Sequence, residues 1–257
     1  MAISNLTQRL EEQSARYFDR PGFSSPSFID ADHIALLDDR NGVPQISVLD
    51  LTDGSIEPAT TFGERVLTLL ASSASGIIVF GMDEGGNEYQ QIWAIAPGGS
   101  PRRLTTSDTS RHEPVSLSRD GKYVYFRSNA RSVGEFDIER IDLVSGERSI
   151  LLENAGQPMD FVPSADGSKL YVESAIGNLA AILFELDTVD GTIRNLTPGP
   201  EGATIFSIAA AGDDALWVST NLDRDFGALV KLGLTTLESE LVLARYWDVE
   251  AVSPSPD

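Results

Sequence analysis

The chain has 257 residues, of which 41% are hydrophobic, and this is enough to bury a sizeable core within one domain. It contains no cysteine, so disulfides, thiolate metal sites and cysteine nucleophiles are excluded. The formal net charge of −20 repels phosphate backbones and anionic lipid, which argues against nucleic-acid and membrane partners.

Residues 1–20 are predicted to be a helical segment. Asn5 is a good N-cap for a short helix over residues 5–18, and Gln8 follows three positions later, as in a capping box. This segment has no apolar stretch typical of a secretory signal, and no apolar run in the chain is long enough to span a bilayer. We therefore expect a cytoplasmic location.

Two kinds of turn return about every 45 residues through the rest of the chain. The first series falls at Asp32, Gly76, Gly121, Gly167, Asp213 and Asp257. The second series falls at Gly54, Gly99, Gly146, Gly191 and Glu238. Short apolar runs of β-branched and aromatic residues lie between these turns, four to a unit, which is typical of a four-stranded propeller blade and not of a helical repeat.

The sequence therefore predicts an all-β protein, with a β-propeller over residues 21–257. The predicted blades are residues 21–64, 65–108, 109–156, 157–202 and 203–245. Residues 246–257 resemble the first strand of earlier units and are predicted to begin a sixth blade. Such a partial propeller leaves apolar blade faces exposed, so we expect it to close into a five-bladed ring, to associate through its exposed blade edges, or to be a truncated product.

The two histidines do not suggest a catalytic or metal site. His33 falls at a predicted hairpin turn and His112 near the start of a predicted inner strand, so structural or exposed roles are expected for both. Without thiols they do not make a zinc site. Residues 83–87 (DEGGN) resemble a calcium loop in composition only and are interpreted as a hairpin loop. The sequence predicts no metal site and no cofactor.

Three carboxylates stand near predicted inner-strand starts: Glu113, Asp160 and Glu250. Propellers with paired carboxylates at the central channel can be glycosidases, so these residues define a remote alternative function. The simpler interpretation is that they bond to backbone groups where strands begin. Trp217 and Trp247, candidate sugar-stacking residues, cannot be placed from the sequence.

Several motifs resemble the N-terminal β-propeller of prolyl oligopeptidase family (S9) serine peptidases, in the acylaminoacyl peptidase and dipeptidyl aminopeptidase-like branch. They are Gly86-Asn87-Glu88 with the glutamines that follow, Ser128-Asn129, and Phe136-Asp137-Ile138. Arg119 stands where that family usually has proline before Asp-Gly, and the Asp-Gly turn is shared with TolB-like propellers. The likeness extends over roughly residues 22–257.

In that family a propeller of seven or eight blades is followed by an α/β-hydrolase domain that carries the catalytic serine, aspartate and histidine. This chain has no G-x-S-x-G elbow, so the resemblance supplies no catalytic residue here and leaves substrate-binding residues unknown. It implies a non-catalytic module that gates or docks substrate, with peptides or a hydrolase domain as partners. The alternative from another class is a stand-alone TolB-like or WD40-like scaffold for protein interactions.

Overall fold

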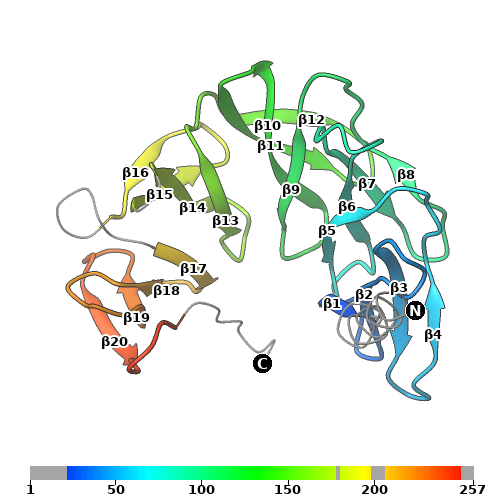
Figure 1. Ribbon diagram of the computed structural model, residues 1–257. Coiled ribbons are helices and arrows are strands. Elements are labelled where there is room, and N and C mark those ends of the chain that lie inside the picture. The colour runs from blue at the N-terminus through cyan, green and yellow to red at the C-terminus, as the bar shows by residue number, and fades with distance from the viewer. Residues whose placement is uncertain (1–21, 178–179, 198–205, 250–257) are drawn as a thin grey trace, which may run out of the picture.

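A computed structural model of the chain describes residues 22–177, 180–197 and 206–249. In these residues the protein is all-β, with five four-stranded antiparallel sheets and no helix. Each sheet is built from four consecutive strands, so the five blades of a propeller follow one another in chain order (Figure 1). In the same residues no helix of a length and apolarity sufficient to cross a bilayer occurs.

The first two blades have the same strand order. Blade 1 comprises β1 (Phe23–Phe28), β2 (His33–Asp38), β3 (Gln45–Asp50) and β4 (Ile56–Pro58). Blade 2 comprises β5 (Val66–Ala71), β6 (Ile78–Met82), β7 (Gln91–Ile95) and β8 (Arg102–Arg103). In both, the first strand lies innermost and the fourth lies at the outer edge (Figure 1).

The remaining three blades repeat this order. Blade 3 comprises β9 (His112–Leu117), β10 (Tyr123–Ser132), β11 (Glu135–Asp142) and β12 (Arg148–Leu152). Blade 4 comprises β13 (Pro158–Pro163), β14 (Lys169–Ile176), β15 (Ala180–Asp187) and β16 (Ile193–Asn195). Blade 5 comprises β17 (Phe206–Ala211), β18 (Ala215–Thr220), β19 (Ala228–Gly233) and β20 (Ser239–Leu243).

The repeated turns have the backbone geometry that their residues favour. Gly121, between β9 and β10, has φ of +68°, and Gly146, between β11 and β12, has φ of +77°. Only glycine adopts this region without steric cost, so glycine at these turns permits tight connections between antiparallel strands. A side chain at Gly121 would also collide with Ser75, since an added Cβ would lie 2.3 Å from the Ser75 hydroxyl.

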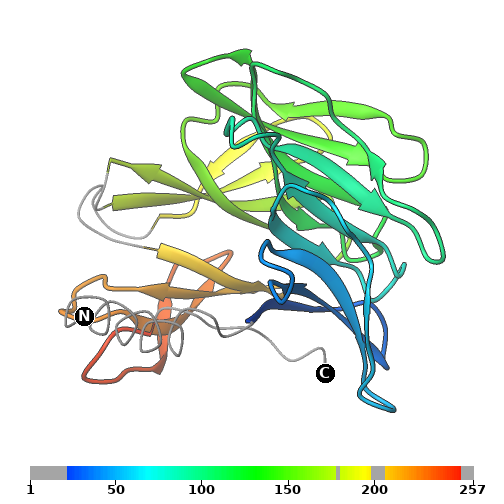
Figure 2. The same ribbon diagram turned by 45° about the vertical axis from the view of Figure 1, so that its right-hand side comes forward.

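The hydrophobic core lies between blades, as expected of a propeller. One buried cluster joins each successive pair of blades, from Phe80 between blades 1 and 2 to Leu216 between blades 4 and 5. Among the described residues no such cluster joins blade 5 to blade 1. The blades therefore form an arc with blades 1 and 5 at its ends (Figures 1 and 2).

Two predicted elements fall largely outside the described residues. The predicted N-terminal helix over residues 5–18 lies entirely outside them, as does most of the predicted sixth-blade strand over residues 246–257. The described part, residues 246–249, contains no strand. There Val249 donates its backbone N–H to the Gly227 carbonyl (3.0 Å), much as His112 donates to Gln90 (2.8 Å) where β9 begins.

Candidate functional site

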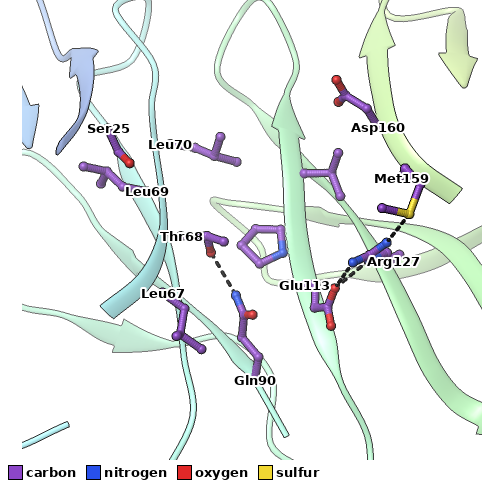
Figure 3. Close-up of a pocket in the computed structure, with 12 residues that line it drawn as sticks. Ser25, Leu67, Thr68, Leu69, Leu70, Gln90, Glu113, Arg127, Met159 and Asp160 are labelled. Carbon is purple, nitrogen blue, oxygen red and sulfur yellow. Dashed lines mark hydrogen bonds and ion pairs between the residues drawn. The ribbon is translucent and has the colours of Figure 1, made fainter. Parts of the chain in front are cut away.

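A pocket of about 390 Å³ opens on the inner surface of the arc, where the first strands of blades 1 to 4 approach one another (Figure 3). Its lining is Ser25 of β1, residues 67–70 of β5, residues 113–115 of β9, residues 159 and 160 of β13, Gln90 and Arg127. Six of the twelve lining residues are apolar and six are polar or charged. The pocket therefore offers both apolar contact and several hydrogen-bonding groups.

Arg127 forms one wall of this pocket, and Glu113 neutralises its charge. Its guanidinium contacts Glu113 Oε2 through both Nε (2.6 Å) and Nη2 (2.5 Å). Its Nη1 donates to the Pro158 carbonyl (2.8 Å), which ties blade 3 to blade 4. The Phe136 ring packs on the guanidinium, with its centroid 5.2 Å from the guanidinium carbon.

Asp160 and Glu173 add two carboxyl groups on blade 4. They lie directly opposite each other in the register of β13 and β14, so both side chains point to the same face of the sheet. Burial raises the pKa of Asp160, and burial followed by the nearby Asp160 charge raises the pKa of Glu173 to about 7. Near neutral pH the pair therefore offers both a hydrogen-bond donor and acceptors, and Asp160 is the member of the pair that lines the pocket.

Blade 2 contributes a polar pair of its own. Gln90 Nε2 donates to Thr68 Oγ1 (2.8 Å), and both residues line the pocket (Figure 3). The pair packs against Gly81, where an added Cβ would lie 1.6 Å from Gln90 Nε2. Glycine at this strand position thus makes room for the glutamine side chain.

The motifs that resemble the peptidase family converge on two arginines beside this pocket. Arg111 Nη2 pairs with Glu88 Oε2 (3.1 Å), and the Arg111 backbone N–H donates to Asn129 Oδ1 (2.8 Å). Arg111 Nη1 also lies 4.0 Å from Glu113 Oε1, and Glu113 binds Arg127, which stacks on Phe136. Residues from three separate motifs therefore form one network that ends at the pocket wall.

Two of the three carboxylates singled out from the sequence line the pocket. Glu113 and Asp160 line the same pocket, whereas Glu250 lies outside the described residues. The sequence predicted that these acids bond to backbone groups where strands begin. Glu113 instead binds the Arg127 side chain. Neither Trp217 of β18 nor Trp247, which is 64% exposed, is among the residues that line this pocket.

Each histidine lies at the first residue of a strand. His33 begins β2 and its Nδ1 lies 2.9 Å from Asp30 Oδ1, which raises the pKa of His33 mainly through that hydrogen bond. His112 begins β9, is 2% exposed, and places Nε2 3.2 Å from Arg148 Nη1. Burial, followed by the Arg148 charge, lowers the pKa of His112 to about 4.

The acidic loop between β6 and β7 binds protein groups. Asp83 Oδ2 accepts from the Glu88 backbone N–H (3.1 Å), and Glu84 pairs with Arg103 (2.7 Å). In the described part of the chain no group of three or more His, Asp or Glu residues is arranged to hold a metal ion.

Sequence reasoning missed Arg127, Gln90 and Glu173. A signal for two of them was present within their strands. Arg127 follows four apolar or aromatic residues (YVYFRS), and Glu173 follows three (LYVES). A charged residue inside such a run needs a partner or a pocket. Their partners Glu113 and Asp160 come from the neighbouring inner strands.

The fold and the inner pocket define the chain as a β-propeller with five four-stranded blades. Its structure is similar to a puromycin-hydrolyzing peptidase from Mycobacterium tuberculosis, with a TM-score of 0.67 at 14% identity, covering 88% of this chain and 39% of that one. It is also similar to a prolyl endopeptidase, with a TM-score of 0.66 at 13% identity, covering 85% of this chain and 35% of that one. This chain therefore spans little more than a third of those peptidases.

A putative TolB from Agrobacterium tumefaciens is similar as well, with a TM-score of 0.62 at 18% identity, covering 86% of this chain and 80% of that one. No family model matches the sequence, and no curated protein matches it. At these identities the likeness establishes the propeller fold that peptidase propellers and TolB share.

Proposed function

We propose that this chain is a non-catalytic propeller module of the prolyl oligopeptidase type, which admits and positions short peptides at its inner pocket. The observation that carries the proposal is the network of Arg111, Glu113 and Arg127. It links the three peptidase-like motifs, through Glu88, Asn129 and Phe136, to the wall of a pocket on the inner surface.

The chemistry of the pocket suits a short peptide in an extended conformation. Leu67, Leu69 and Met159 supply apolar area, while Gln90 and Asp160 supply groups that can bond to backbone amides. Because Glu113 neutralises Arg127, the pocket has no excess positive charge that would select an anion. The peptide-bond chemistry itself belongs in this proposal to a hydrolase domain on other residues.

The test is peptide binding to the purified full chain, measured by calorimetry with blocked tri- and tetrapeptides. We expect weak binding that falls about tenfold in Arg127→Gln, because this change frees the Glu113 charge and loosens β13. Arg224→Gln, in the exposed loop between β18 and β19, is the matched control and should bind as the parent chain does. A fluorophosphonate probe should label no serine.

Two results contradict the proposal. One is the absence of peptide binding at millimolar concentration by a chain that unfolds cooperatively. The other is equal binding by the parent chain and Arg127→Gln. Serine labelling would overturn the non-catalytic part alone. A cytoplasmic location stays a prediction from the sequence.

A TolB-like scaffold for protein interaction is the second candidate. The observation that favours it is coverage, since the chain corresponds to 80% of the Agrobacterium TolB chain but to 39% of the puromycin-hydrolyzing peptidase. A scaffold would bind a folded protein through its loops and leave the inner pocket unused. Binding that survives Arg127→Gln but is lost on changes in exposed loops would select this candidate.

A further inference from the structure

Each blade presents one repeated position to the blade that follows it, on what we call its forward face. This position lies two residues after the residue whose carbonyl closes the hairpin between the first and second strands. The residues that hold it in blades 1 to 4 are Ala35, Val79, Tyr125 and Tyr171. All four are at most 4% exposed. Each belongs to the hydrophobic cluster that its blade shares with the next one.

The opposite face, which we call the backward face, has a matching pattern. Two residues of each second strand, one on either side of the forward residue, pack onto the preceding blade. They are Ile78 and Phe80, Val124 and Phe126, Leu170 and Val172, and Leu216 and Val218 in blades 2 to 5. The same junction is thus built four times, from one forward residue and two backward residues.

One forward face and one backward face have no partner sheet among the described residues. Trp217 holds the forward position of blade 5, is half-buried, and faces Lys231, whose Nζ lies 5.9 Å from its ring centroid. On the backward face of blade 1, Ile34 lies directly opposite Phe28, which is 50% exposed. Leu36 is itself buried (6% exposed), so Phe28 and Ile34 are the accessible part of this face.

These two faces share part of the pattern that the chain joins four times internally: a forward residue at Trp217 and one accessible backward residue at Ile34, with Phe28 of the first strand beside it. We propose that two copies of this chain associate head to tail, with the backward face of blade 1 in one copy packed on the forward face of blade 5 in the other. A forward aromatic residue, Trp217, would then meet an aliphatic and an aromatic residue, Ile34 and Phe28. Tyr125 and Tyr171 make the same kind of contact with the blades that follow them.

The net negative charge of the chain makes this association depend on ionic strength. Each copy carries a net charge of −20, so two copies repel each other at low ionic strength. Salt screens this repulsion while leaving apolar contact intact. The association should therefore strengthen as salt is raised, contrary to an interface made of ion pairs.

The test is sedimentation velocity of the full chain over a hundredfold range of concentration at low and high salt. We expect association that depends on concentration and grows with salt. Phe28→Glu and Trp217→Glu should each raise the apparent dissociation constant at least tenfold. Val189→Glu, at an 87% exposed position in the turn between β15 and β16, is the control and should leave it unchanged.

Mixing the two variants distinguishes a head-to-tail junction from nonspecific association. The Phe28→Glu copy keeps an intact blade 5, and the Trp217→Glu copy keeps an intact blade 1. An equimolar mixture should therefore form one junction and recover a dimer that neither variant forms alone. If Trp217→Glu fails to fold, Phe28→Glu, which changes a half-exposed residue, still decides whether blade 1 takes part.

Three outcomes overturn the proposal. The first is a parent chain that stays monomeric over the whole concentration range. This result overturns the proposal whether a fluorescence quencher reaches Trp217 or other residues of the same chain shield it. The second is association that both variants retain. The third is a mixture of folded variants that recovers no dimer.

Discussion

Arg148 and Glu139 form a paired contact on the face of blade 3 that meets blade 2, in which the carboxylate is buried and the guanidinium is partly exposed. Arg148 Nη2 donates to Glu139 Oε1 (2.7 Å) and Arg148 Nε donates to Glu139 Oε2, while the glutamate side chain is 2% exposed. The same guanidinium reaches Ser128 on β10 (3.4 Å) and His112 on β9 (3.2 Å). One side chain from the outermost strand therefore contacts all three other strands of its blade.

Removal of this cation should destabilise the protein strongly. Arg148→Met leaves the Glu139 carboxylate buried without a counter-charge, and we expect a loss of about 3 to 5 kcal/mol in the free energy of unfolding. Urea denaturation at pH 7.5 measures it. The double variant Arg148→Met with Glu139→Gln should recover part of the loss, because the buried charge is then gone. Equal stability of the single variant and the parent would contradict the burial of this pair.

His112 should make the protein less stable as the pH falls. Its pKa is about 4 in the folded chain, against 6.5 for the free side chain, so the unfolded chain binds the proton more readily. Stability is therefore full above about pH 6.5, falls between pH 6.5 and 4, and levels off below, with a total loss of about 3 kcal/mol from this group.

Urea denaturation at several pH values, compared between the parent chain and His112→Asn, isolates that contribution. The difference between the two should shrink steadily from pH 7 to pH 4. A constant difference would show that His112 does not titrate in this range. NMR of the imidazole ring should report a neutral side chain at pH 5.

Much of the fold could be predicted from the sequence because its turns and strands depend on residues that are close together in the chain. The turn glycines, such as Gly121 and Gly146, recur at a regular spacing and adopt the positive φ that tight turns need. Strand residues such as 123–128 alternate between the two blade faces, with Tyr125 packed toward blade 4 and Phe126 toward blade 2. Period and alternation together predicted the five four-stranded sheets.

The candidate site was predicted only in part, because its residues meet across blades. Glu113 and Asp160 were singled out by their place near strand starts, and both line the pocket. Their partners were missed for different reasons. Arg127 lies opposite Glu113 only after a register shift between β9 and β10, and such an irregularity leaves no local sequence signal. Glu173 lies opposite Asp160 in the regular register of the β13–β14 hairpin, so counting outward from the turn at Gly167 pairs these two residues.

Glu173 should act on stability in the direction opposite to His112. Its pKa is about 7 in the folded chain and 4.5 in the free side chain, so the folded chain binds the proton more readily. The ionised form therefore costs stability above pH 7, and that cost disappears as the pH falls to 4.5. Glu173→Gln should raise stability at pH 8 by about 2 kcal/mol, after allowance for partial exposure, and by little at pH 4.5.

Urea denaturation of Glu173→Gln at both pH values checks this expectation. Glu185→Gln is the matched control on the adjacent strand, because Glu185 pairs with Arg194 (2.8 Å) and its removal should give no gain at pH 8. Destabilisation by Glu173→Gln at pH 8 would show that the carboxylate has a favourable partner in the folded chain.

Gly81 should tolerate no side chain without disturbing the pocket. An added Cβ would lie 1.6 Å from Gln90 Nε2 and 2.5 Å from Thr68 Oγ1, so Gly81→Ala must displace Gln90 and break its bond to Thr68. We expect a loss of about 1 to 3 kcal/mol in unfolding free energy. Gly134→Ala, where an added Cβ meets nothing within 4 Å, should change stability by less than about 0.5 kcal/mol. Peptide binding should weaken in Gly81→Ala alone, since only that change moves a residue of the pocket, and equal binding by the two variants would place the peptide elsewhere.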